Sequence, residues 1–149
     1  MARPLTILYA EDEENDVFFL EHAFKLAGLP HSLKAVPDGA QAVEYLAGEG
    51  IFADRTQHPF PDLILLDINM PKQSGLDVLE WVRGHPCYKS LPTLILTSSS
   101  RPEDMEKARQ LGADDYLLKP SNPLKLVEVA MSLHEHWLSQ LAIASEVAV

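Results

Sequence analysis

The feature that most restricts the fold of this chain is a regular alternation of short apolar runs with amphipathic stretches. Five apolar runs, each followed by apolar residues at helical spacing, are typical of parallel strands joined by crossover helices. The predicted strands are residues 5–9, 32–35, 63–66, 93–96 and 116–118. Three of these runs are nearly all apolar, as strands covered on both faces should be. The pattern predicts an open α/β sheet that is doubly wound by helices.

Residues typical of helix boundaries stand between the predicted strands. The first helix is predicted to run from about Asn15 to Ala27, before Gly28. The remaining helices are each preceded by a residue whose side chain can cap the helix N-terminus. These predicted N-caps are Asp38, Ser74, Ser100 and Asn122. Ser100 and Glu103 have the spacing of a capping box, and the last helix is predicted to extend to about Leu141.

Length, charge and cysteine content limit the class of protein. With 149 residues, we expect one domain over residues 1–149, a core over about 5–141 and a flexible tail at 142–149. The formal net charge of −10 disfavours nucleic acid and anionic membranes as partners. No segment has the pattern of a membrane span or a secretion signal. Cys87, the only cysteine, cannot form an internal disulfide, so we expect a cytoplasmic protein.

Polar side chains follow four of the predicted strands at the points where the strands end. Glu11 and Asp12 follow the first strand, Asp67 follows the third, Thr97 the fourth and Lys119 the fifth. In open α/β sheets the ligand crevice lies beyond the carboxyl ends of the strands. We therefore expect these five side chains to converge on one site.

Such a site has the donors for phosphoryl chemistry. Acidic oxygens suit a hard cation such as Mg²⁺. Asp67 could attack phosphorus as a nucleophile and form an acyl phosphate. The cation and Lys119 would neutralise the transferring group, and Thr97 could hydrogen-bond one of its oxygens.

Taken together and in order, these residues resemble the receiver domain of two-component response regulators, and the likeness covers nearly the whole chain. The matching residues are Glu11, Asp12, Asp67, Asn69, Pro71, Gly75, Thr97, Ser98, Tyr116, Lys119 and Pro120. The resemblance implies a flavodoxin-like, doubly wound sheet of five parallel strands in the order 2-1-3-4-5, with five helices. It also implies Mg²⁺-dependent phosphotransfer from a histidine of a sensor kinase to Asp67.

The resemblance implies finer roles as well. The main-chain carbonyl of Asn69 would be a cation ligand, and the Lys119–Pro120 bond would be cis. Thr97 and Ser98 would contact the phosphoryl group with Lys119.

The roles of Tyr116 and Glu11 are less directly implied by the resemblance. Tyr116 would be the switch residue that follows Thr97 on phosphorylation, although a plain core role is the alternative. Glu11 stands where many family members carry Asp, so we expect Asp12 to bind the cation directly and Glu11 to act more through water.

A narrower likeness is to the stand-alone receivers paired with phytochrome-type photoreceptor kinases. It rests on the long loop before the third strand, His85-Pro86, the run from Thr97 to Ser99, and Trp137 in an extended last helix. This likeness implies a phytochrome-type kinase as the partner.

Two surfaces are candidate interfaces. Phe18 shares its side of the first helix with charged residues, so we predict that it is exposed and docks against the kinase; a rotated helix that buries it is the alternative. The last helix carries more apolar residues than one stripe needs. We therefore predict a homodimer through the face formed by the fourth helix, fifth strand and fifth helix.

Three other functions fit parts of the pattern. A Mg²⁺-dependent phosphohydrolase would need a general acid two residues after the nucleophile, where Asn69 stands. A flavin-binding electron carrier would need a phosphate cradle after the first strand, where four acids stand instead. A pseudo-receiver that takes no phosphoryl group is the third alternative. We favour a phosphoacceptor switch that is not a turnover enzyme.

Overall fold

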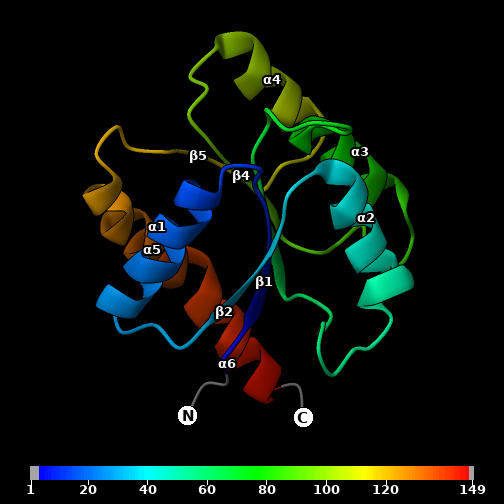
Figure 1. Cartoon of the computed structure of the whole chain (residues 1–149), viewed down its shortest axis with the longest axis horizontal. Helices are drawn as coiled ribbons and strands as arrows, with labels where there is room; N and C mark the ends of the chain where they lie inside the picture. The colour runs from blue at the N-terminus through cyan, green and yellow to red at the C-terminus, as the bar shows by residue number, and fades with distance from the viewer. Residues whose placement is uncertain (1–3, 148–149) are drawn as a thin grey trace.

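A computed structural model describes residues 4–147 of the chain and shows a parallel sheet between two layers of helices (Figure 1). The strands are β1 (Thr6–Ala10), β2 (Ser32–Val36), β3 (Leu63–Leu66), β4 (Thr93–Thr97) and β5 (Asp115–Leu118). The helices are α1 (Glu14–Leu26), α2 (Gly39–Ala47), α3 (Gly75–Gly84), α4 (Pro102–Gln110), α5 (Leu126–Leu133) and α6 (Ser139–Val147). All strand pairs are parallel and the order is β2-β1-β3-β4-β5, so the predicted fold is confirmed.

Alternate residues of the central strands enter two separate cores. Leu8 of β1 and Ile64 of β3 pack with α2 and α3, whereas Ile7 and Leu63 pack with α1 and α5. Figure 1 shows α1 and α5 together on one side of the sheet and α2 and α3 on the other. Every residue of β3 is fully buried, and each such leucine or isoleucine contributes about 1.5–3 kcal/mol through burial. The sheet centre is therefore a rigid base for the residues at its ends.

The caps predicted for the second and third helices are confirmed. Asp38 accepts a hydrogen bond from the backbone N–H of Gln41, and Ser74 forms a reciprocal capping box with Asp77. The cap predicted at Ser100 is wrong, since α4 begins two residues later at Pro102. Proline suits the first helical position because its missing N–H would have no partner there.

The helix at the end of the chain is longer than predicted. Asn122 caps the 3-10 helix η2 (Pro123–Lys125), and the chain continues through α5, the π-helix η3 (His134–Leu138) and α6. Ala142, placed in the predicted tail, is buried in the core beside α1 and α5. The tail prediction is wrong for residues 142–147, which are helical, and residues 148–149 lie outside the described part of the chain. No helix within residues 4–147 has the length and apolar character needed to cross a membrane.

A histidine pair joins the start of the sheet to the last helix. His31 Nδ1 accepts a hydrogen bond from the backbone N–H of Leu5 at 3.0 Å, and its Nε2 lies 3.1 Å from His134 Nδ1. A neutral His31 therefore carries its proton on Nε2 and donates it to His134. Burial lowers the pKa of His31, His134 acts in the same direction, and Asp62 opposes them.

We expect this pair to make stability depend on pH. The unfolded chain binds a proton at His31 near the ordinary pKa of about 6.5, more readily than the folded chain, so the free energy of unfolding falls as the pH drops below that value. Urea unfolding at pH 7.5 and 5.5 should show a larger stability difference between wild type and His31→Gln at pH 7.5. His136→Gln, which changes an exposed histidine, is the control. An equal difference at both pH values would contradict the expectation.

Candidate functional site

Three acids meet at the carboxyl ends of two neighbouring strands. Glu11 and Asp12 follow β1, and Asp67 follows β3 directly. One carboxylate oxygen from each lies within 4.8 Å of the others. Glu11 and Asp67 are buried, whereas Asp12 is exposed. The predicted convergence is seen for these three acids because the sheet order places β1 beside β3.

Lys119 lies among these acids. Its backbone N–H donates to the carbonyl of Thr97 at 2.8 Å, which holds the end of β5 beside β4. Its Nζ lies 2.9 Å from Asp67 Oδ2 and 2.9 Å from Asp16 Oδ2, and it also donates to Glu11 Oε1. One ammonium group therefore donates hydrogen bonds to three carboxylates.

Asp16 was not identified from the sequence. It lies in the first turn of α1, where acids commonly interact with the helix dipole without any further role. The available indication was its position one helical turn after Asp12, on a helix that starts directly beyond β1. Sequence position alone could not show that Lys119 reaches it.

For both Glu11 and Lys119, burial and the hydrogen bonds between them have opposite effects on the pKa. Burial raises the pKa of Glu11 to about 7, although the hydrogen bond from Lys119 counteracts it. Burial lowers the pKa of Lys119, but the hydrogen bonds to Asp67, Glu11 and Asp16 outweigh it and leave the pKa above its ordinary value. Lys119 is therefore a permanent cation at neutral pH.

The two oxygens of Asp67 have different surroundings. Oδ2 accepts from Lys119, whereas Oδ1 is buried and has no hydrogen-bond partner among the described residues. A buried carboxylate oxygen without a partner is costly and calls for a ligand. An all-oxygen donor set from Glu11, Asp12 and Asp67 suits a hard divalent cation, so the residues fit such an ion.

The loop from β3 to α3 shapes the position of Asp67. A Cβ atom added to Gly75 would lie 2.1 Å from the Asp67 carbonyl oxygen, so only glycine allows this approach. Gly39 at the start of α2 is needed in the same way, because its Cβ would lie 2.3 Å from the Gln73 carbonyl oxygen. Asn69 and Pro71 are exposed in this loop, and the role of the Asn69 carbonyl stays a prediction.

The predicted switch residues lie along β4 and β5. Thr97 is fully buried at the end of β4, and its Oγ1 accepts from the backbone N–H of Ser99 at 3.3 Å. Tyr116 is half-buried and its hydroxyl donates to the Ser99 carbonyl at 2.8 Å. Ser98 is exposed and lines a cavity together with Lys119. Tyr116 is thus tied to the loop that follows Thr97.

The conformation expected at Pro120 is not found. No cis peptide bond occurs within residues 4–147, so the Lys119–Pro120 bond is trans. The trans isomer is the more favourable one for a peptide bond before proline, by about 0.5–1 kcal/mol.

Comparison with known proteins assigns this site to a family. The model of the response regulator receiver domain matches residues 7–131, which include every residue of the site. The chain belongs to the response regulator receiver domain family. It is 30% identical over 140 residues to the response regulator Rcp1 of Synechocystis sp., covering 94% of this chain and 93% of that protein.

Solved structures of receiver domains give the same picture. The phosphorylated cyanobacterial phytochrome response regulator RcpA aligns with a TM-score of 0.84 and 32% identity, covering 93% of this chain and 96% of that one. The Mn²⁺-bound form of Rcp1 aligns with a TM-score of 0.80 and 31% identity, covering 91% and 95%. The chain is therefore a receiver domain homologous to phytochrome response regulators.

Proposed function

We propose that this receiver domain accepts a phosphoryl group on Asp67 and transmits the change through protein binding. The supporting observation is the state of the Asp67 carboxylate. One oxygen is bound to Lys119, and the other is buried beside two further acids without a hydrogen-bond partner in residues 4–147. In transfer from a kinase phosphohistidine, a carboxylate oxygen of Asp67 would form the new P–O bond. The P–N bond would break, and the imidazole nitrogen would keep the electron pair.

The proposal includes Mg²⁺ as the divalent cation. Glu11, Asp12 and Asp67 would hold it, with the Asn69 carbonyl as a further ligand. A bound cation neutralises charge on the phosphoryl oxygens. The Mn²⁺-bound structure of Rcp1 supports a divalent ion in this family. Mg²⁺ is the proposed ion because hard cations prefer sites made only of oxygen ligands.

The switch would act through Thr97, Ser98 and Tyr116. A phosphoryl group on Asp67 offers new acceptor oxygens to the Thr97 hydroxyl, the Ser98 backbone and Lys119. Movement of Thr97 would disturb the Ser99 loop, which the Tyr116 hydroxyl holds through the Ser99 carbonyl. The result would be a population shift on the α4 and β5 surface.

Phosphoacceptance is tested by intact mass measurement after incubation with phosphoramidate or acetyl phosphate. With Mg²⁺ the protein should gain the mass of one phosphoryl group, and the adduct should be labile in hydroxylamine, as acyl phosphates are. Excess EDTA should suppress the gain. Lack of any adduct at saturating Mg²⁺ would refute the proposed function.

The proposed partner is a sensor histidine kinase of the phytochrome type, because the related RcpA is a phytochrome response regulator. Such a kinase draws its phosphoryl group from ATP, which places the proposed function in the cytoplasm. We propose further that residues 1–149 act as a single receiver domain, without nucleic acid or membrane as a partner, because the net charge is −10.

Phe18 is proposed to dock against the kinase. Its side chain is 61% exposed on α1, one turn beyond the start of the helix, and it stacks on His22. Phe18→Ala should slow phosphotransfer from the kinase about tenfold or more, as loss of a buried aromatic contact would, without slowing phosphorylation by acetyl phosphate. Leu26→Ala is the control, since Leu26 is equally exposed at the far end of the same helix. Equal slowing with both phosphodonors would reject the docking role.

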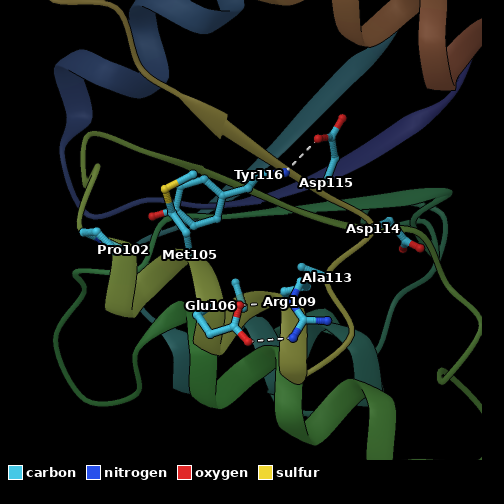
Figure 2. A pocket seen from close by; sticks show the side chains of 9 residues that line it. Pro102, Met105, Glu106, Arg109, Ala113, Asp114, Asp115 and Tyr116 are labelled. Carbon is cyan, nitrogen blue, oxygen red and sulfur yellow. Dashed lines mark hydrogen bonds and ion pairs between the residues drawn. The ribbon is translucent and has the colours of Figure 1, made fainter.

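A homodimer through the α4, β5 and α5 face is also proposed, on different grounds from the prediction. Most apolar residues of the last helical segment, such as Leu133 and Leu138, are buried or pack against the core and need no partner, although Met131 of α5 is exposed. On the proposed face, exposed apolar side chains also lie at Met105 of α4 and Leu118 of β5. A cavity of about 500 Å³ lies between α4 and β5. Met105 and Tyr116 line it, as Figure 2 shows.

Sedimentation measurements test the homodimer. The dimer fraction should increase when a beryllium fluoride analogue of the phosphoryl group is bound, and Met105→Glu should reverse the increase by burying a charge at the interface. Lys107→Gln, a change at an exposed position of the same helix that does not line this cavity, should leave the dimer intact. A monomer with and without the analogue would exclude this interface.

In this proposal the protein is a phosphorylation switch and not an enzyme that turns over a substrate. A phosphohydrolase that uses an aspartyl phosphate needs a general acid near the nucleophile, and Asn69 carries an amide at that place in the sequence. Hydrolysis of an aryl phosphate at rates above the protein-free background would contradict this part of the proposal.

A further inference from the structure

A tyrosine hydroxyl contacts the acidic site from inside the sheet. Tyr9 is a β1 residue that is 1% exposed, and its ring packs in the core with α1 and α5. Because residues two apart on a strand point to the same face, Tyr9 and Glu11 lie on one side of β1. The Tyr9 hydroxyl donates a hydrogen bond to Glu11 Oε1 at 3.1 Å.

The hydrogen bonds of Glu11 leave its carboxylate little freedom. Oε1 accepts from Tyr9 and Lys119, and Oε2 accepts from the backbone N–H of Glu13 at 3.2 Å. Within residues 4–147, Tyr9 is the one uncharged side chain that hydrogen-bonds any of the three acids of the site. A divalent cation among these acids competes with the Lys119 ammonium for the same oxygens. The neutral Tyr9 hydroxyl does not repel the cation and can keep its hydrogen bond.

We propose that Tyr9 is a positioning residue that holds the Glu11 carboxylate in the orientation required for cation binding. This inference rests on the proposed cation site. A glutamate has one more rotatable bond than an aspartate, and the hydrogen bond from Tyr9 fixes the added torsion. Groups that orient metal ligands in this way typically change metal affinity 10- to 100-fold when they are removed.

The test is Tyr9→Phe, which keeps the ring and removes only the hydroxyl. Calorimetric titration with Mg²⁺, checked by Mn²⁺ electron paramagnetic resonance, should give a Kd about tenfold or more above that of wild type. Phosphorylation by acetyl phosphate should need more Mg²⁺ for half-maximal rate but should reach a similar rate at saturation. A loss confined to the saturated rate would contradict a positioning role.

Tyr45→Phe is the matched control. Tyr45 is also 1% exposed, and its hydroxyl donates to the Pro59 carbonyl at 2.8 Å, away from the acids. Tyr45→Phe should lose stability comparably, with the Mg²⁺ Kd unchanged. The Tyr9 effect should also vanish in a Glu11→Gln background, because Tyr9 acts through the Glu11 carboxylate. An additive loss in the double variant would overturn the inference.

A second measurement uses the wild-type sequence, so it stays informative even if the Tyr9→Phe variant folds poorly. In wild type labelled with 3-fluorotyrosine, the Tyr9 ¹⁹F resonance should shift on Mg²⁺ titration with the calorimetric midpoint, and the Tyr45 resonance should not. If wild type binds Mg²⁺ but Tyr9→Phe binds it equally well, only the Tyr9 inference fails. If wild type binds no Mg²⁺, the proposed cation site fails.

Discussion

Asp67→Asn is expected to leave the protein folded and unable to gain a phosphoryl group from either acetyl phosphate or a kinase. The substitution keeps the size of the side chain and one acceptor oxygen for Lys119, but it removes the carboxylate nucleophile. Lys119 keeps Glu11 and Asp16 as partners, and the site loses one of its crowded negative charges. We therefore expect complete loss of the adduct, with the free energy of unfolding unchanged or increased.

Asp38→Asn is the control for that experiment. Asp38 is 4% exposed, close to the 6% of Asp67, and it caps α2, a task that asparagine performs equally well. Intact mass measurement should show the wild-type adduct for Asp38→Asn and none for Asp67→Asn. A stable adduct on Asp67→Asn would mean that another side chain is the phosphoacceptor.

Gly75→Ala is expected to damage both stability and phosphoacceptance. The added Cβ would lie 2.1 Å from the Asp67 carbonyl oxygen, and neither the start of α3 nor the buried end of β3 can move without loss of packing. Overpacking of this kind costs about 1–3 kcal/mol. Displacing Asp67 by a fraction of an ångström should slow adduct formation by about 10- to 100-fold.

The control is Gly84→Ala at the opposite end of α3. A Cβ at Gly84 meets nothing within 4 Å, so stability should be unchanged or slightly higher, and phosphorylation should proceed as in wild type. Urea unfolding gives the first quantity, and the rate of adduct formation well below the melting temperature gives the second. Similar results for the two variants would show that the close approach at Gly75 does not hold Asp67 in place.

Several contacts of the site and of the surrounding fold could not be predicted from the sequence. Asp16 resembled an ordinary acid at a helix start, Tyr9 an ordinary strand residue, and His134 an ordinary surface histidine. The partners of Asp16 and His134 lie far along the chain: Lys119 contacts Asp16 across 103 residues, and His31 contacts His134 across 103 residues. No periodicity or capping pattern reports on such distant pairs.

Local interactions explain what the sequence by itself determined. The five apolar runs form the strands because their side chains need burial. Asp38 and Ser74 start their helices because their side chains satisfy N–H groups only three residues away. The reactive residues were found because they directly follow the apolar runs. Each of these features depends on neighbours within a few residues.

Only the tertiary structure decided how those residues are connected. The order β2-β1-β3-β4-β5 brings the end of β1 against the end of β3, and Lys119 reaches both from β5. It also leaves one oxygen of Asp67 buried without a hydrogen-bond partner among the described residues. Hydrogen bonds and ion pairs act over a few ångströms of space, whatever the separation in sequence, so these contacts exist only once the sheet is assembled.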